Sequence, residues 1–277
     1  MKRKRIGICA PSTPISLDDA EKVTALAARI HPDIELVFSE QCYASAGHFA
    51  GDDKLRCDAF VEMANDPELE AIWFARGGYG AVRIAEEAVA RLKGPARDKL
   101  YVGYSDGGNL LAALYKAGIG TQAHGPMPVD IKRENGEMAV ARALNWIVAN
   151  DPVSLEPDIK EDRKYVAFNL TTLAILCGTS LLPDLANHIL MIEEISEYHY
   201  ALDRAMFSIT NHFANSGLTG IKLGQVTAIP QNERPFGQSA QAIARYWCMR
   251  HEIPYLGRAE IGHDSDNHIV PFGLATI

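Results

Sequence analysis

The stretch KLYVGYSDGGNLLAALYKAG, residues 99–118, carries the pattern that indicates the fold. A short apolar run predicts a β-strand, and this run leads into Gly-Tyr-Ser-Asp-Gly-Gly. A helical pattern follows and stops at Gly118, a residue type that is common just after a helix. The stretch therefore predicts a strand, a tight turn that holds Ser105, and a helix.

Units of the same kind precede this one along the first half of the chain. Alternating strands and helices are typical of a parallel sheet with helical crossovers, an α/β fold. The loops at the carboxyl ends of such strands usually carry the function. Ser16 is the expected N-cap of the first helix, because two acids follow it. We expect strands within residues 5–12, 34–40, 70–80 and 99–106, and helices at 16–30, 53–66, 81–92 and 107–118.

The pattern changes in the second half. One more helix is expected at residues 133–151, followed by the charged, proline-containing segment DPVSLEPDIKEDRKY, which we expect to be exposed and mobile. The remainder favours strands at 188–195 and 217–229 and helices at 200–217 and 239–253. We therefore divide the chain into a first domain (1–130), a connecting helix and linker (131–165), and a C-terminal domain (166–277).

Composition excludes several classes of function. The 277 residues have a formal net charge of −8, which disfavours a nucleic-acid partner. Five cysteines without a CxxC pair indicate neither a disulfide framework nor a zinc site, and they suit a reducing cytoplasm. No apolar run is long enough to span a membrane. The basic N-terminus precedes an apolar run that is too short for a signal peptide, so we expect a cytoplasmic protein.

Ser105 lies in a G-x-S-x-G pattern between a predicted strand and a predicted helix. This turn holds a nucleophilic serine clear of the backbone in some hydrolases, and the N–H of the next residue, Asp106, then stabilises an oxyanion. A purely structural turn explains the pattern equally well at this point. Gly77 and Gly78 follow the preceding strand and are candidates for a second oxyanion donor. A dinucleotide-binding site in this loop is disfavoured, because Arg83 occupies the third glycine position of the dinucleotide fingerprint.

A nucleophilic serine needs a base and a carboxylate that orients the base. His263 lies in the polar loop EIGHDSDNH, and His124 in AHGPMP is its rival. Glu193, Glu194 and Glu197, in the stretch MIEEISE at the end of a predicted strand, are the candidate orienting residues. His263 and His268 do not have the spacing of a known metal motif, so we expect no metal.

These segments together resemble the LD-carboxypeptidases, serine peptidases that include the microcin C immunity proteins. The resemblance implies a flavodoxin-like parallel N-terminal domain and a strand-rich, partly barrel-like C-terminal domain. The matching stretches, in family order from residue 6 to residue 273, are IGICAPS, HFAGDDKLRCDAFVEMANDPELEAIWFARGGYGAVR, YVGYSD, HGPM, GTSLLPDL, ILMIEEISEYHYALDR and GHDSDNHIVPFG.

The family has a Ser–Glu–His triad, which the resemblance places on Ser105, Glu193 and His263. The oxyanion donors would be the N–H groups of Asp106 and of Gly78 or Gly77. Glu194 occupies a position where the family usually has aspartate. Because neighbouring residues on a strand point to opposite faces, only one glutamate can reach the histidine, and we favour Glu193.

The implied activity is hydrolysis of the amide to a C-terminal D-alanine in a murein tetrapeptide, in the cytoplasm, by a homodimer without a cofactor. One alternative keeps the triad and cleaves acyl-sulfamoyl-adenylate peptides, and another is a binding protein without catalysis. An NAD-dependent enzyme is disfavoured. Ala167-Phe168 replaces the family's glycine pair, which puts the exact peptide in doubt. The candidate substrate-binding residues are Arg83, Asn169, Glu194 and Arg204, with Arg234 as a further candidate for the terminal carboxylate.

Overall fold

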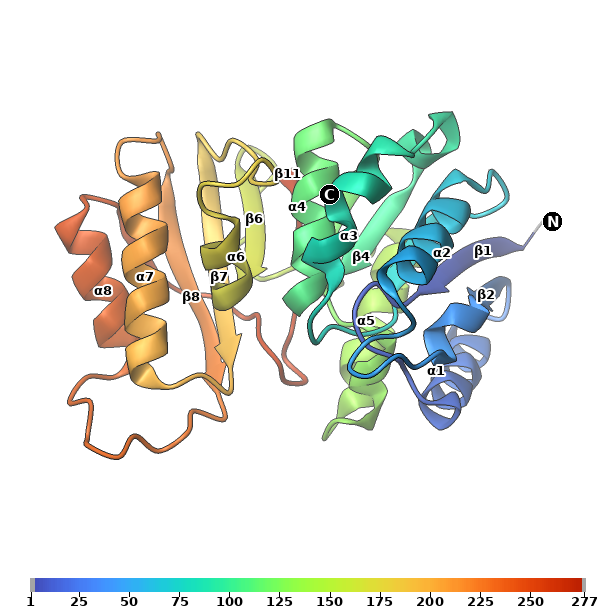
Figure 1. Ribbon diagram of the computed structural model, residues 1–277, viewed down its shortest axis with the longest axis horizontal. Coiled ribbons are helices and arrows are strands. Elements are labelled where there is room, and N and C mark those ends of the chain that lie inside the picture. Colours follow the sequence, from blue (N-terminus) through green and yellow to red (C-terminus); the bar gives the residue numbers. More distant parts are fainter. Residues whose placement is uncertain (1–2, 276–277) are drawn as a thin grey trace.

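Two β-sheets, one in each half of the chain, form the framework of the protein. They are described here from a computed structural model that defines residues 3–275. The two halves lie side by side along the long axis of the molecule, and their sheets have six and five strands (Figure 1). The α/β class expected from the sequence is confirmed.

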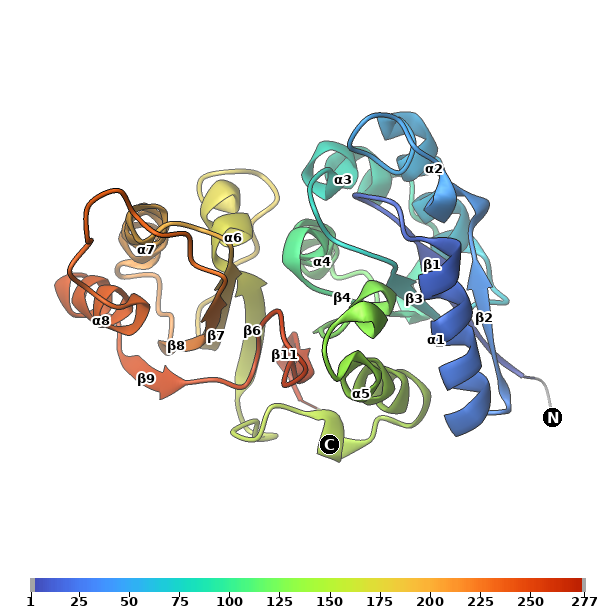
Figure 2. The same ribbon diagram turned by 90° about the horizontal axis from the view of Figure 1, so that it is seen from below.

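The N-terminal sheet has the strand order β10-β5-β4-β3-β1-β2. Strands β1 to β5 are parallel, and the order 2-1-3-4-5 is that of flavodoxin-like domains. Helices α2, α3 and α4 cover one face, and α1 and α5 cover the other (Figure 2). The strands are β1 (Lys4–Cys9), β2 (Ile34–Phe38), β3 (Ala71–Phe74), β4 (Leu100–Gly103), β5 (Thr121–His124) and β10 (Val270–Pro271). The helices are α1 (Leu17–Ile30), α2 (Asp53–Asn65), α3 (Ala81–Ala90), α4 (Gly108–Ala117) and α5 (Gly136–Ala149).

Local signals in the sequence set the ends of these helices. Ser16 accepts a hydrogen bond from the N–H of Asp19 and caps α1, as predicted. Asp52 caps α2 in the same way, through the N–H of Leu55. Gly118 ends α4 with a left-handed φ of 62°, which glycine adopts without a steric penalty.

The C-terminal sheet has the order β11-β6-β7-β8-β9 and is parallel except for β11. It is an open sheet with two edge strands, so the barrel-like character expected for this domain does not extend to a closed barrel among the described residues. Helices α6, α7 and α8 pack side by side on one face (Figure 1). The elements are β6 (Lys164–Asn169), α6 (Leu170–Leu176), β7 (His188–Ile195), α7 (His199–Phe213), β8 (Gly220–Thr227), α8 (Ala240–Arg250), β9 (Tyr255–Arg258) and β11 (Gly273–Leu274).

The end of the chain connects the two domains. Strand β10 pairs with β5 of the N-terminal sheet, and β11 then pairs with β6 of the C-terminal sheet. The two domains are therefore joined by main-chain hydrogen bonds as well as by the linker.

The linker after α5 is only partly exposed, in contrast to the expectation from its charge. Leu155 forms a bridge with Ile269, and the Glu156 side chain is 2% exposed. Lys222 Nζ, from β8, lies 2.9 Å from Glu156 Oε1 and 2.5 Å from Asp158 Oδ2. These ion pairs hold a segment whose composition alone predicted a free loop.

Candidate active site

Ser105 lies in a strained turn between β4 and α4. Its φ is 55°, a left-handed conformation that is uncommon for a residue with a side chain and that clusters at functional sites. Gly103 and Gly107 flank it, and a Cβ at these positions would come within 2.6 Å and 2.9 Å of the Phe74 ring. The small neighbours are therefore required by packing around the Ser105 turn.

Glu193 and His263 form a buried pair. Glu193 Oε2 lies 2.6 Å from His263 Nδ1, and the two side chains are 0% and 6% exposed. Burial lowers the pKa of His263, but the charge and the hydrogen bond of Glu193 more than compensate, so its pKa is raised above the ordinary value. This arrangement stabilises the protonated imidazole that a general base becomes.

Tyr104 connects this pair to the serine. Its ring packs against the His263 ring with a centroid distance of 4.7 Å, and Tyr104 directly precedes Ser105 in the chain. The Tyr104 hydroxyl donates to Asp130 Oδ1 at 2.9 Å, which fixes the ring. Within residues 3–275, no hydrogen bond joins the Ser105 hydroxyl to His263, and such contacts often tighten only when substrate binds.

Glu194 has a different set of partners, which are the end of β6, the start of α6 and the next residue of β7. Its carboxylate accepts from Asn169 Nδ2 at 2.7 Å, from the N–H and hydroxyl of Thr171 at 2.9 and 2.7 Å, and from the N–H of Ile195 at 2.8 Å. Asn169 is the N-cap of α6. Glu194 and Asn169, both candidate substrate-binding residues, thus anchor the start of α6.

Helix α6 in turn supports the serine. The hydroxyl of Thr172, in its first turn, donates to the carbonyl oxygen of Ser105 at 3.3 Å. A Cβ on Gly108 would also contact Phe168 and Thr172, which shows how closely β6 and α6 approach the serine turn. Phe168, one of the two residues that replace the family's glycine pair, therefore packs against the start of α4.

The side chain of Asp106 has a structural role. Its Oδ2 accepts from the hydroxyl of Ser12 at 2.5 Å and from the N–H of Ala81 at 2.8 Å, and its Oδ1 accepts from Asn109 Nδ2 at 3.0 Å. Burial raises the pKa of Asp106, and these hydrogen bonds oppose the rise. The carboxylate thus connects the serine turn to the loop after β1 and to the segment after β3. The main-chain N–H of Asp106 lies at the start of a helical turn, where such groups have no partner within the helix.

The glycine loop after β3 lies against the serine. A Cβ on Gly77 would lie 3.0 Å from both Cβ and Oγ of Ser105. The carbonyl of Gly77 accepts from the N–H and the hydroxyl of Thr13, at 3.3 and 2.6 Å. Because a trans peptide points its C=O and N–H in opposite directions, the N–H of Gly78 points away from Thr13.

His124, the rival base, lies on another side of Tyr104. Its Nε2 is 2.9 Å from Asn267 Oδ1, which also accepts from the N–H of Gly262 at 3.2 Å. Burial lowers the pKa of His124 to about 4, so it is neutral near pH 7. It therefore helps to hold the loop that carries His263, rather than contacting the Glu193 carboxylate.

The predicted arginine candidates have other partners or lie at the surface. Arg83 forms an ion pair with Asp53 at 2.6 Å. Arg204 is exposed and lies 5.2 Å from the centre of the Tyr200 ring, and Arg234 is exposed. Sequence reasoning missed Arg76 and Tyr104, although both lie inside the motifs it singled out. Within these motifs, the candidates were the glycines, Ser105, the N–H of Asp106, and Arg83.

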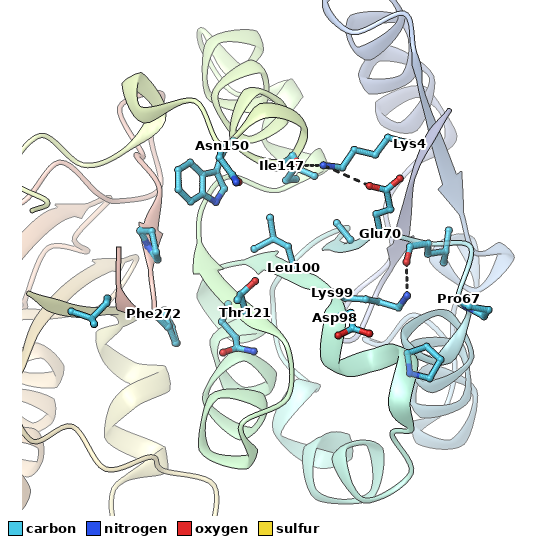
Figure 3. Close-up of a pocket in the computed structure, with 17 residues that line it drawn as sticks. Lys4, Pro67, Glu70, Asp98, Lys99, Leu100, Thr121, Ile147, Asn150 and Phe272 are labelled. Carbon is cyan, nitrogen blue, oxygen red and sulfur yellow. Dashed lines mark hydrogen bonds and ion pairs between the residues drawn. The ribbon is translucent and has the colours of Figure 1, made fainter. Parts of the chain in front are cut away.

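A separate cavity of about 640 Å³ lies at the opposite end of the N-terminal sheet, near the first residues of β1, β3, β4 and β5. Figure 3 shows Lys4 extending toward Glu70 and Ile147 there. Lys4 Nζ donates to the Ile147 carbonyl at 2.8 Å, and Lys99 Nζ donates to the Asp66 carbonyl at 2.7 Å. Its lysines are thus already bound by the protein, and none of the triad candidates lines it.

Residues 3–275 contain no group of three or more His, Cys, Asp or Glu side chains arranged to hold a metal ion. None of their helices is long and apolar enough to cross a membrane.

The protein is thus an α/β protein with one sheet in each half, in which a buried Glu193–His263 pair packs against the residue that precedes Ser105. Its sequence matches the LD-carboxypeptidase N-terminal domain over residues 6–125 and the LD-carboxypeptidase C-terminal domain over residues 164–277. The chain belongs to the LD-carboxypeptidase family.

Relatives with names and solved structures cover nearly the whole chain. The murein tetrapeptide carboxypeptidase of Pseudomonas aeruginosa is 26% identical, over 99% of this chain and 92% of its own. The crystal structure of a muramoyltetrapeptide carboxypeptidase from Oxalobacter formigenes has a TM-score of 0.80 and 24% identity, and covers 98% of this chain and 95% of its own. A microcin C7 self-immunity protein shares the fold, with a TM-score of 0.80, 16% identity, and coverage of 99% and 92%.

Proposed function

We propose that the protein is a serine-type LD-carboxypeptidase that releases the C-terminal D-alanine of a murein tetrapeptide. The observation that carries this proposal is the buried Glu193–His263 pair, packed against the residue that precedes Ser105. The family supports carboxypeptidase chemistry, and the names of the relatives support the murein peptide as the substrate. As part of this proposal, the enzyme acts as a cytoplasmic homodimer in peptidoglycan recycling.

In the proposed mechanism, three side chains act in turn. Ser105 Oγ attacks the carbonyl carbon of the scissile amide, and His263 Nε2 accepts the hydroxyl proton as the new C–O bond forms. The tetrahedral intermediate collapses when the C–N bond breaks, and His263 gives the proton to the leaving amine of D-alanine. Water then hydrolyses the acyl-enzyme through the same base. Glu193 keeps the Nδ1 proton in place and stabilises the imidazolium.

Two main-chain donors are proposed to bind the oxyanion. One is the N–H of Asp106, which follows the nucleophile at the start of a helical turn. The other is the N–H of Gly78, because Thr13 holds the preceding carbonyl on the opposite side of the same peptide unit. Each such donor typically contributes about 2.7–4 kcal/mol to transition-state binding.

The experiment is turnover of a murein tetrapeptide by the wild-type and Ser105→Ala proteins, followed as release of D-alanine. We expect the substitution to lower kcat by at least ~10³-fold while the peptide still binds. A fluorophosphonate probe should label Ser105 in the wild type only. Peptide binding without release by the wild type would instead indicate a non-catalytic binding protein. Faster cleavage of an aminoacyl-sulfamoyl adenosine would favour the immunity-type substrate.

A further inference from the structure

We propose that Arg76 binds the C-terminal carboxylate of the substrate and so makes the enzyme an exopeptidase. This inference rests on the proposed function, because it concerns the residue that leaves when Ser105 attacks. It names a specificity residue that lies outside the triad and the oxyanion donors.

Arg76 is adjacent to the reacting centre. It directly precedes Gly77, and a Cβ on Gly77 would lie 3.0 Å from Ser105 Oγ. Consecutive Cα atoms are ~3.8 Å apart, so the Cα of Arg76 lies within roughly 8 Å of the nucleophile. In a scissile amide, the carboxylate of the leaving amino acid is only three bonds from the attacked carbon. A long arginine side chain spans the remaining distance.

The guanidinium is held at this end of the sheet with donors to spare. Its Nη1 donates to the carbonyl of Pro14 at 3.0 Å, in the loop that follows β1. The preceding residue, Thr13, contacts Gly77 and Gly78, which places Pro14 beside the same glycine loop. One contact fixes the side chain while the other N–H groups of its planar fork stay available.

Arg76 also lacks the acidic partner that nearby arginines have. Arg56 and Arg83 both pair with Asp53, and Arg133 pairs with Asp130 at 2.7 Å. Over the described part of the chain, no carboxylate forms an ion pair with Arg76, and its side chain is half-buried.

An unpaired, half-buried guanidinium on the residue before the glycine loop suits a carboxylate that arrives with the substrate. Arginine binds carboxylates in a bidentate manner, and burial makes the contact stronger than it would be in water. A peptide that continues beyond the scissile bond would place an uncharged amide there instead. The site would then discriminate against internal peptide bonds.

The test compares two substrates, a murein tetrapeptide that ends in D-alanine and the same peptide that ends in D-alaninamide. For the wild type we expect kcat/KM to favour the acid by about 10- to 100-fold, the size expected for hydrogen bonds to a charged group. In Arg76→Gln, the value for the acid should fall to near that for the amide, which should change little. Arg76→Lys should recover part of the preference, because it keeps the charge and loses the fork.

Arg29→Gln is the matched control, since Arg29 is an exposed residue paired with Glu137 and should leave both values unchanged. Equal losses on both substrates in Arg76→Gln would overturn the inference and would indicate an effect on the transition state or the fold. The inference would also be overturned if Arg76→Gln kept the preference for the acid, or if Arg204→Gln lost it.

A wild type that cleaves neither peptide would instead overturn the proposed function. Binding to the Ser105→Ala protein, with and without Arg76→Gln, then decides the inference separately. A preference for the acid that depends on Arg76 supports it, and equal or absent binding of both peptides overturns it.

Discussion

Replacing Glu193 by glutamine tests how the site controls its histidine. The change removes one charge from a fully buried contact and keeps the shape of the side chain. Glu193 Oε1 has no hydrogen-bond partner among the described residues, so no acceptor holds the NH₂ of a glutamine away from His263. That NH₂ can turn toward Nδ1, which moves the imidazole proton to Nε2. The histidine is then unable to accept the proton of Ser105.

The expected loss follows from the distance of 2.6 Å between Glu193 Oε2 and His263 Nδ1. With an effective dielectric constant of about 20, two unit charges at this separation attract by roughly 6 kcal/mol, an upper limit because burial disfavours both ions. A neutral hydrogen bond retains about 1 kcal/mol of this. We therefore expect the transition state to lose about 3–5 kcal/mol, which corresponds to a fall in kcat of ~10²- to 10⁴-fold.

The assay is kcat/KM for D-alanine release as a function of pH. Only a neutral His263 accepts a proton, so activity is lost as the pH falls through its raised pKa. Without the charge of Glu193, this acid limb should move to lower pH. The contact with Glu193 that raises this pKa also stabilises the folded protein. This contribution is complete below about pH 6.5, the pKa of histidine in the unfolded chain, and is lost as the pH rises through the folded-state pKa.

Glu194→Gln is the matched control on the next residue of the strand. Every partner of the Glu194 carboxylate is a donor, so an NH₂ group there faces another donor and loses a hydrogen bond. We expect a loss of about 1–3 kcal/mol in the free energy of unfolding, a lower Tm, and an acid limb that stays in place. Our reasoning is refuted if Glu194→Gln shifts the acid limb, or if Glu193→Gln stays within tenfold of the wild type.

Two other substitutions test the glycine loop and the linker. Gly77→Ala places a methyl group 3.0 Å from Ser105 Oγ and should lower kcat at least ~10-fold with a small change in Tm. Gly94→Ala is the control, because Gly94 has open space around it, and it should change neither kcat nor Tm. Equal activity of the two variants would contradict the close approach of Gly77 to Ser105. Lys222→Met leaves the buried carboxylate of Glu156 without its cation and should cost about 3–5 kcal/mol of unfolding free energy, measured by urea denaturation; a loss below about 1 kcal/mol would show that the pair is dispensable.

The strands and helices of the N-terminal domain were largely predictable, because residues close together in the sequence determine them. The first four apolar runs are each followed by a helical pattern, and short-range signals such as Ser16 and Gly118 set helix ends within a few residues. The alternation of these units then leaves few topologies other than a parallel sheet. The opposite directions of Glu193 and Glu194 were predictable for the same reason, since strand geometry alone separates them.

The contacts that complete the site were not predictable, because they join segments far apart in the chain. Tyr104 packs against His263, and Arg76 reaches Pro14, through contacts that no local pattern encodes. The partial burial of the linker also depends on a contact between distant segments. Its charges predicted an exposed loop, and the cation that buries Glu156 is Lys222, 66 residues away.

The two adjacent glutamates of β7 explain how a site divided between two domains keeps its geometry. Glu193 holds the histidine on one face of the strand. On the other face, Glu194 holds the cap of α6, and Thr172 of that helix donates to the carbonyl of Ser105. A shift of β7 therefore moves His263 and the support of Ser105 together. Because the tail of the chain pairs with both sheets, the same strand is also fixed relative to β4. The spacing between His263 and Ser105 thus depends on β7 and on the paired tail of the chain rather than on the linker alone.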